Sequence, residues 1–161
     1  MRYYVDTSAA AKLLVNEVES ETVAAFLDEV VDRGDQLTSS YILETESRRL
    51  AARDGLDQAV VTELMKRFAL LLPDRELYRD AGLLPGPALR SLDALHLASA
   101  LRLSADILVT YDARQRLAAR SVGLQTVSPG VPIEGLEPRP LGTDAGHFKV
   151  PDDFDDEVND L

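Results

Sequence analysis

Four acidic residues spread along the chain stand at positions where their carboxylates could share a metal site. Asp6 follows the apolar run RYYV, and Asp112 follows DILVTY. Asp93 opens the segment DALHLASAL, and Glu46 lies within SSYILETESRR. Mg²⁺ and Mn²⁺ prefer carboxylate oxygens and bind phosphate oxygens alongside them. The pattern therefore predicts an acidic pocket for a divalent metal and indicates metal-dependent phosphodiester hydrolysis.

The elements that would position these acids alternate along the chain. Short β-rich runs are separated by apolar residues at helical spacing, which is typical of crossover units around a parallel sheet. The predicted class is α/β, a three-layer α/β/α domain with a central parallel sheet. We predict strands at residues 3–6, 36–39, 107–110 and 124–127, and helices at 8–15, 22–31, 41–53, 57–72, 76–83, 92–103 and 113–121.

Three of the acids are expected at one edge of this sheet. Asp6 and Asp112 follow the carboxyl ends of two predicted strands. Ligand sites in open α/β sheets lie outside those ends. Asp93 falls in the first turn of its helix, close to a cap. A shared pocket is therefore predicted at the carboxyl edge of the sheet.

The fourth acid is predicted from the face of a helix. Glu46 shares a face with Leu43 and Leu50, at spacings of three and seven residues, so it should point inward with the apolar stripe. An inward carboxylate needs a partner, and a metal ion is one such partner. Glu44 is a rival for this role, although it lies about 160° away around the helix. We favour Glu46.

Polar neighbours of the acids supply further candidates. Ser8 could hydrogen-bond Asp6 or could simply cap the first helix, and Thr110 could assist beside Asp112. His96 is expected to be a packed, hydrogen-bonded side chain rather than a ligand. Four arginines near the predicted site are candidates for contacts with nucleic-acid phosphates, with ordinary helix-surface charge as the alternative: Arg48, Arg49, Arg114 and Arg116.

Composition limits the chemistry further. The chain has 161 residues, no cysteine and two histidines, so neither a disulfide framework nor a thiolate zinc site is available, and a His-rich metal site is not expected. No signal peptide or membrane span is evident, which predicts a cytoplasmic protein with no membrane partner. A net charge of -11 argues against binding nucleic acid by bulk electrostatics. Any nucleic-acid partner must therefore be bound locally.

The acidic excess is concentrated at the end of the chain. Residues 132–161 contain nine acidic residues against Arg139 and Lys149, a net charge of -7. The remaining body therefore carries only about -4 of the total of -11. We predict two parts, a catalytic domain at residues 1–130 and an acidic segment with its linker at 131–161.

The body resembles the PIN-domain ribonucleases, specifically the VapC-type toxins of bacterial toxin-antitoxin pairs. The matching segments are YYVDTSAAAKL, TSSYILETESRRLAAR, LRSLDALHLASALRL and DILVTYDARQRLAARSVGLQTVSPG. The resemblance implies a PIN-like fold whose acidic site is Asp6, Glu46, Asp93 and Asp112, assisted by Ser8. It also implies an endoribonuclease that depends on Mg²⁺ or Mn²⁺, cuts structured RNA such as tRNA or rRNA, is commonly a homodimer, and is silenced by an antitoxin.

The C-terminal segment carries a second resemblance. GTDAGHFKVPDDFDDEVNDL looks like the end of VapB-type antitoxins, which suggests a fusion, natural or engineered. We hypothesise that residues from about 138 onward dock on this chain's own body, or on another copy, and place Arg139 or Lys149 in the acidic pocket. Tethering would give an effective concentration in about the mM range. Without this resemblance, the run PDDFDDE would indicate a disordered acidic end.

One alternative from another functional class stays open. The same scaffold could be a catalytically silent RNA-binding or assembly module whose acids are occupied by the C-terminal segment. Haloacid-dehalogenase-like phosphatases are disfavoured, since Asp6 is followed by Thr7 and Ser8 rather than by an Asp two positions later. Metal-dependent cleavage that disappears in Asp6→Asn and Asp93→Asn would exclude the silent module.

Overall fold

Five parallel strands form the centre of the part that the structure describes. The computed structural model describes residues 1–132. The strands are β1 (Arg2–Val5), β2 (Gln36–Ser40), β3 (Ala69–Leu71), β4 (Ile107–Val109) and β5 (Gln125–Val127), in the order β3-β2-β1-β4-β5. The order reverses between β1 and β4. The carboxyl ends of these two neighbours therefore form the place where open α/β sheets bind ligands.

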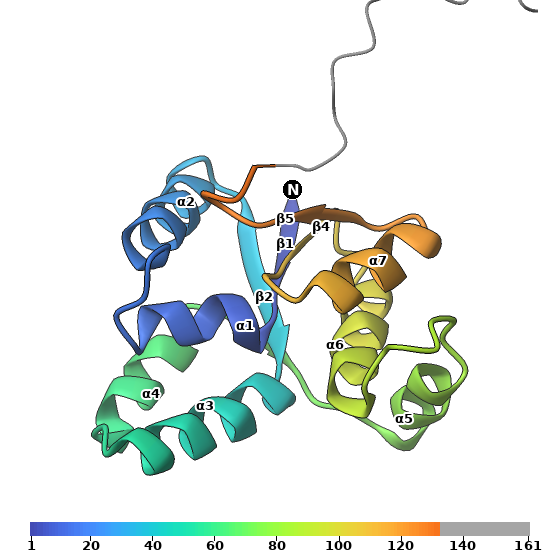
Figure 1. Ribbon diagram of the computed structural model, residues 1–161, viewed down its shortest axis with the longest axis horizontal. Helices are drawn as coiled ribbons and strands as arrows, with labels where there is room; N and C mark the ends of the chain where they lie inside the picture. The colour runs from blue at the N-terminus through green and yellow to red at the C-terminus, as the bar shows by residue number, and fades with distance from the viewer. Residues whose placement is uncertain (133–161) are drawn as a thin grey trace, which may run out of the picture. The chain divides into compact units, whose positions relative to one another are not determined.

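Helices cover both faces of the sheet (Figure 1). One face carries α1 (Thr7–Ala10), a 3₁₀ turn η1 (Ala11–Leu13), α2 (Ser20–Asp32), α3 (Tyr41–Asp54) and α4 (Gln58–Met65). The other carries α5 (Arg75–Gly82), α6 (Ser91–Arg102) and α7 (Ala113–Ser121). The predicted three-layer α/β/α fold is thus confirmed.

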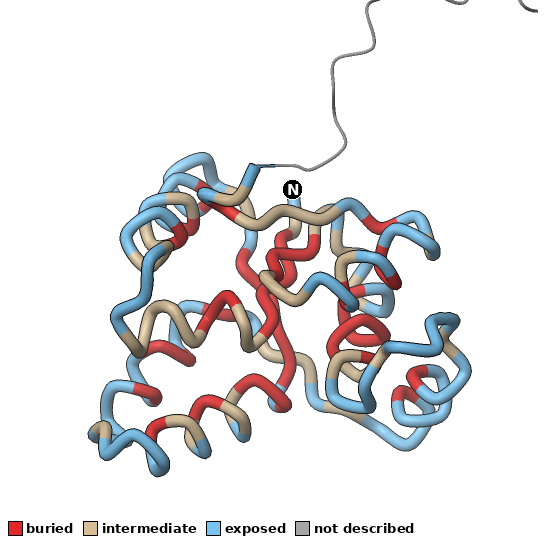
Figure 2. The backbone as a smooth tube through the Cα atoms, in the orientation of Figure 1, coloured by how far each residue is buried: buried red, intermediate tan, exposed pale blue. Residues whose placement is uncertain are grey.

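Each face of the sheet has its own apolar core. In β1, Tyr3 and Val5 pack with the α1 to α4 side, whereas Tyr4 packs with α6 and α7. This alternation follows from the two-residue period of a strand. All three side chains are buried, and the buried backbone runs through the middle of Figure 2. Strand β1 is therefore buried on both faces, and Asp6 at its end is carried into the interior.

The largest error of sequence reasoning concerns the predicted helix at 57–72. Helix α4 ends at Met65, and Ala69–Leu71 forms strand β3, which pairs with β2 from Thr38 to Ser40. The run ALLL suits a helix or a strand equally, and pairing with the exposed edge of β2 decides for the strand. The predicted helix at 8–15 also differs, since it consists of α1 followed by η1.

Neither Ser40 nor Ser91, the serines at the starts of α3 and α6, caps its helix with its side chain. Ser40 is at the N-cap of α3, but its side chain makes no capping bond and is instead hydrogen-bonded to the Tyr4 hydroxyl. Arg90, not Ser91, is the N-cap of α6. Asp6 and Asp112 are the residues that cap α1 and α7 with their side chains. Two of the predicted metal ligands therefore also start helices.

The acidic C-terminal segment lies outside the described residues. This includes Arg139 and Lys149 and the antitoxin-like sequence, so docking of this segment on the body stays a prediction. Among the helices of residues 1–132, none is both long enough and apolar enough to cross a membrane.

Candidate active site

Asp6 is a buried carboxylate held only by neutral donors. Its Oδ1 accepts hydrogen bonds from Ser8 Oγ at 2.8 Å and from the Ala9 N–H at 3.2 Å, and its Oδ2 accepts one from Thr110 Oγ1 at 3.1 Å. Burial raises the pKa of Asp6 to about 6, although these donors and His96 pull it down. A nearby cation would favour the charged carboxylate.

Asp112 is joined to Asp6 through one side chain. The Asp112 N–H donates to Thr110 Oγ1 at 3.1 Å, and the same hydroxyl donates to Asp6. Burial would raise the pKa of Asp112. The N–H groups of Gln115 and Arg114, which donate to its Oδ1 at 3.2 Å and 2.7 Å, hold that pKa below its ordinary value. Asp112 is therefore a fixed anion at the start of α7.

Asp93 has a buried oxygen without a hydrogen-bond partner. Among the described residues, nothing donates to its Oδ2. Burial raises the pKa of Asp93, and the negative charges of Asp112 and Glu46 raise it further. A buried carboxylate oxygen without a donor is costly, and a cation would supply the missing partner. Asp93 thus marks the point where positive charge is most needed.

Glu46 faces these carboxylates, and Glu44 does not. Glu46 Oε2 accepts hydrogen bonds from Thr7 Oγ1 and from His96 Nε2, the latter at 2.9 Å. Burial works against the charged form, but these two donors hold the pKa of Glu46 below its ordinary value. Glu44 instead accepts from Arg48 at 2.6 Å, one turn along the same helix. The geometry therefore favours Glu46 over its rival.

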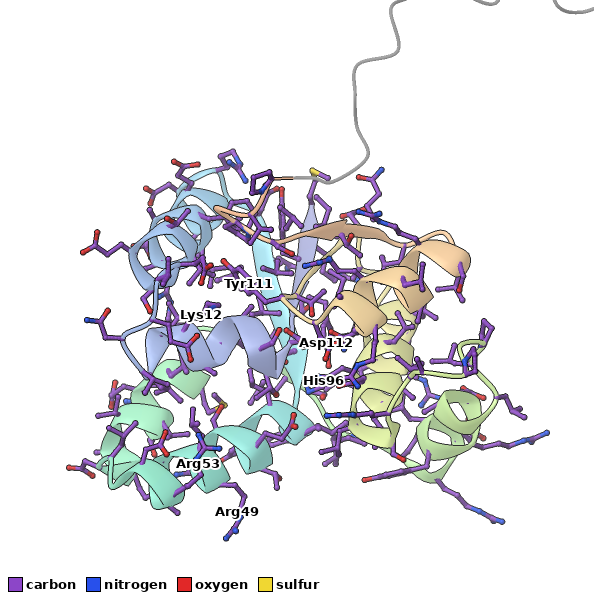
Figure 3. All side chains as sticks on the ribbon, in the orientation of Figure 1. Lys12, Arg49, Arg53, His96, Tyr111 and Asp112 are labelled. Carbon is purple, nitrogen blue, oxygen red and sulfur yellow. The ribbon has the colours of Figure 1, made fainter. Side chains whose placement is uncertain are left out.

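His96 and Thr7 are members of this cluster that sequence reasoning did not place there. His96 is buried and hydrogen-bonded as predicted, but its contact with Glu46 joins α6 to α3 across 50 positions of sequence. One signal pointed to it: His96 lies three residues after Asp93, so both project from one face of α6. Figure 3 labels His96 on α6 and Asp112 at the start of α7.

The four candidate RNA-binding arginines are placed differently from one another. Arg48 is tied to Glu44 and also donates to side chains of α4, while Arg49 is exposed and points away from the body (Figure 3). Arg116 donates to Ser128 Oγ at 3.0 Å. Arg114 lies 3.4 Å from Asp112. Arg114 is thus the one of the four that contacts an acid of the candidate site.

The four acids have the oxygen ligands that suit a hard divalent cation, although the side chains are not gathered closely enough to hold one. Within residues 1–132, no group of three or more Asp, Glu, His or Cys side chains is close enough to hold a metal ion. All four acids nevertheless offer the oxygen ligands that Mg²⁺ and Mn²⁺ prefer, and Asp93 offers an unpartnered one. Binding would require side-chain rotations that bring these oxygens onto one cation.

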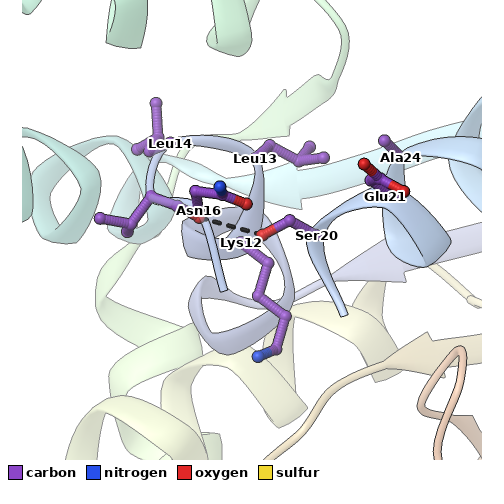
Figure 4. A pocket seen from close by; sticks show the side chains of 8 residues that line it. Lys12, Leu13, Leu14, Asn16, Ser20, Glu21 and Ala24 are labelled. Atoms are coloured by element: carbon purple, nitrogen blue, oxygen red, sulfur yellow. Dashed lines mark hydrogen bonds between the residues drawn. The ribbon is translucent and has the colours of Figure 1, made fainter. Parts of the chain in front are cut away.

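A surface cavity of about 360 Å³ lies elsewhere, between η1 and the start of α2 (Figure 4). Leu13, Leu14, Asn16 and Ser20 are among its lining residues, and none of the four acids is. The Lys12 ammonium pairs with Glu17 and Glu19 and lies 4.6 Å from the centre of the Tyr111 ring. This cavity therefore contributes nothing to the acidic cluster.

Comparison with known proteins identifies the family. The PIN domain model matches residues 3–121. Ribonuclease VapC35 of Mycobacterium tuberculosis is 36% identical over 132 residues, which covers 79% of this chain and 96% of that relative. The chain belongs to the PIN-domain family, among its VapC-type members. The predicted family resemblance of the body is confirmed.

Solved structures of PIN-domain proteins share the fold. VapC20 of Mycobacterium tuberculosis, described as a sarcin-ricin loop cleaving toxin, superimposes with a TM-score of 0.61 at 18% identity and covers 79% of this chain and 99% of its own. VapBC-1 of Haemophilus influenzae gives a TM-score of 0.58 at 20% identity, covering 80% and 98%. At such identities the likeness concerns the PIN fold alone.

Proposed function

We propose that this PIN-domain protein is a toxin that acts as an endoribonuclease, depends on Mg²⁺ or Mn²⁺, and cuts structured RNA such as tRNA or rRNA. The observation that carries the proposal is the unpartnered, buried Asp93 oxygen beside the charges of Asp112 and Glu46. Such an arrangement is costly without a cation and suits one well. The ribonuclease VapC35 supports the RNA substrate, because this chain matches almost its whole length.

In this proposal the four acids hold the metal and the neutral donors hold the acids. Asp6, Glu46, Asp93 and Asp112 would be the ligands. A bound divalent cation supplies a Lewis acid and an activated water for attack on phosphorus. Thr110 links Asp6 to Asp112, so one side chain is bonded to residues at both strand ends. Ser8 Oγ also accepts from the Tyr111 N–H at 2.7 Å, which fixes the donor that orients Asp6.

RNA contacts must be local, because the body carries little charge of either sign in excess. Arg114 is the best placed of the four candidates, since it lies beside Asp112 on the exposed side of α7. Arg116 and Arg49 would extend that contact along the backbone of the RNA, whereas Arg48 is engaged with Glu44. We also propose a homodimer, and a VapB-type antitoxin as partner, in keeping with VapBC-1 among the fold relatives.

We further propose that the C-terminal segment inhibits the site in cis or in trans through Arg139 or Lys149. The support is the resemblance of that segment to antitoxin ends and the surplus of negative charge that a basic side chain would meet at the site. The test compares RNA cleavage by the full chain with cleavage by a chain ending at Gly130. A faster truncated chain is expected, and equal rates would contradict inhibition.

Cleavage of structured RNA tests the proposed activity. The full chain and the chain ending at Gly130 are incubated with total tRNA and with rRNA in Mg²⁺, in Mn²⁺ or in EDTA, and the new ends are mapped. Discrete cuts that need the metal and disappear in Asp93→Asn are expected. If neither chain cuts any of these RNAs, the silent RNA-binding module becomes the better account.

A further inference from the structure

We infer that His96 is a positioning residue for Glu46, acting through a buried hydrogen-bonded chain that runs from Ser40 through Tyr4 and His96 to the Glu46 carboxylate. This inference rests on the proposed function, in which Glu46 is a metal ligand. It assigns His96 no contact with metal or RNA. Its role is to hold one carboxylate oxygen of Glu46 so that the other oxygen stays available to a metal ion.

The contacts form a continuous chain through the interior. Tyr4 and His96 are buried, and the Tyr4 hydroxyl lies 2.8 Å from His96 Nδ1 and 3.0 Å from Ser40 Oγ. On the other side of the ring, His96 Nε2 lies 2.9 Å from Glu46 Oε2. The two rings meet edge to face, at 72° with centroids 5.8 Å apart. The imidazole is therefore held at both of its nitrogens.

The chemistry of the partners sets the direction of the last bond. A charged carboxylate only accepts hydrogen bonds, so His96 Nε2 must carry a proton where it meets Glu46. Burial raises the pKa of Tyr4, which keeps its phenol protonated and able to donate. A ring nitrogen that is anchored by one partner orients the group bound to the other. Tyr4 is thus the anchor and Glu46 the group that is oriented.

Only one oxygen of Glu46 is used in this way. Both donors, His96 Nε2 and Thr7 Oγ1, bind Oε2, and within residues 1–132 no hydrogen bond reaches Oε1. The donors come from α6 and α1, while Glu46 is on α3. Two elements therefore hold one oxygen of Glu46 and leave the second for a cation. Asp93 lies one helical turn before His96. Helix α6 therefore carries one proposed metal ligand, Asp93, and also the residue that orients a second, Glu46.

The test substitutes His96 in two ways. His96→Gln keeps a side-chain N–H near the position of Nε2, and His96→Leu removes it at similar volume. In each full-length variant, Mn²⁺ binding without RNA is measured from the electron paramagnetic resonance signal of free Mn²⁺, and cleavage of total tRNA is followed against Mn²⁺ concentration. His96→Leu should lose about 10–100-fold in Mn²⁺ affinity and in maximal rate. His96→Gln should recover about tenfold of that loss.

A destabilised control separates positioning from folding. Leu97 is fully buried beside Tyr4 in the core, and Leu97→Ala should lower the unfolding temperature while leaving the Mn²⁺ affinity and the maximal rate within about threefold of the unmodified chain. Equal Mn²⁺ binding and equal rates in His96→Leu and the unmodified chain would overturn the positioning role. Equal losses in His96→Gln and His96→Leu would also overturn it.

A second measurement does not depend on activity. The chain has two histidines, so the ¹⁵N resonances of the His96 ring are assigned by comparison with His147→Gln. At neutral pH we expect a protonated Nε2 whose resonance changes in Glu46→Gln and in Tyr4→Phe. An unprotonated Nε2 overturns the inference even if the protein cleaves RNA. A protonated Nε2 in a protein without Mn²⁺ binding or cleavage overturns the proposed function and supports the hydrogen-bonded chain alone.

Discussion

Acidic residues at the amino edge and at the carboxyl edge of the central sheet differ in the partners that the structure gives them. At the amino edge, Asp106 and Asp35 immediately precede β4 and β2, and each has a straightforward partner: Asp106 accepts the Arg2 N–H at 2.6 Å, and Asp35 faces the Arg33 guanidinium at 3.4 Å. At the carboxyl edge, Asp6 is held by hydroxyl and backbone donors, and Asp93 keeps a buried oxygen without any donor among the described residues. The same kind of side chain stabilises one edge and is left in need of a cation at the other.

This contrast shows at which edge of the sheet the acidic residues reduce the stability of the fold. An acid at the amino edge is exposed or ion-paired and costs little. At the carboxyl edge, burial raises the pKa of both Asp6 and Asp93, and the negative charges of Asp112 and Glu46 raise that of Asp93 further. Stability is given up where the metal is proposed to bind, as is usual at functional sites. The following predictions test that division, from the largest expected effect to the smallest.

Neutralising Asp93 should remove activity without harming the fold. Asp93→Asn keeps the shape of the side chain but loses the charge that a cation requires, so cleavage of structured RNA should fall by about a thousandfold or more, about 4 kcal/mol. The matched variant at the amino edge, Asp106→Asn, should cleave at the unmodified rate. Equal activity of these two variants would mean that the edges do not differ in function.

Neutralising Asp6 should make the metal-free protein more stable. The pKa of Asp6 is raised from 3.8 to about 6, so its contribution to stability is present below the unfolded value and is lost as the pH rises through the folded one. At pH 7.5 the charged form therefore costs up to about 3 kcal/mol, which Asp6→Asn avoids. Cleavage should be lost in the same variant.

Urea unfolding in EDTA at pH 4 and pH 7.5 measures this effect. The stability advantage of Asp6→Asn over the unmodified chain should be small at pH 4 and should reach its full size near pH 7. An advantage that is independent of pH, or a variant that is less stable at both values, would show that burial does not penalise the Asp6 charge.

The basic residues at the carboxyl edge sharpen the comparison. Arg114→Ala should weaken cleavage of total tRNA three- to tenfold, about 1 kcal/mol, because a cation beside Asp112 is lost from the path of the RNA. Arg48→Ala is the control on α3, since Arg48 is engaged by Glu44. Rates measured at two salt concentrations check this, and equal losses in both variants would remove Arg114 from the proposed RNA contact.

The smallest effect is expected at the amino edge. Asp106→Asn weakens one charge-assisted hydrogen bond to the Arg2 N–H at an exposed position, so the free energy of unfolding should fall by about 1 kcal/mol or less. If the free energy of unfolding fell in Asp106→Asn by as much as it rises in Asp6→Asn, the acids of the amino edge would not be the low-cost residues that we expect.

Sequence reasoning located the fold and the candidate acids because both depend on local pattern. Helix α7 at Ala113–Ser121 was predicted with its observed bounds, and the position of Asp6 after a buried strand followed from the run RYYV. Strand β3 was missed because Ala69–Leu71 has no pattern that separates a strand from a helix. Its structure is decided by pairing with β2, which lies about 30 positions earlier in the chain.

The connections within the candidate site could not be predicted in the same way. His96 was expected to be packed and hydrogen-bonded, but its partner Glu46 is on a helix that only the fold brings near. Arg48, a predicted RNA contact, forms an ion pair with Glu44 in the structure, and the four-residue spacing of the two could have indicated this pair. Long-range contacts need the fold, whereas contacts within one helix can be predicted from spacing.

Mn²⁺ binding by the full chain without RNA tests the difference between the two edges most directly. The unmodified protein, Asp93→Asn and Asp106→Asn are titrated with Mn²⁺ at neutral pH, and free Mn²⁺ is followed by electron paramagnetic resonance. We predict saturable binding in the unmodified protein and in Asp106→Asn, and its loss in Asp93→Asn. Equal binding by all three proteins would contradict a metal site built on the carboxyl edge.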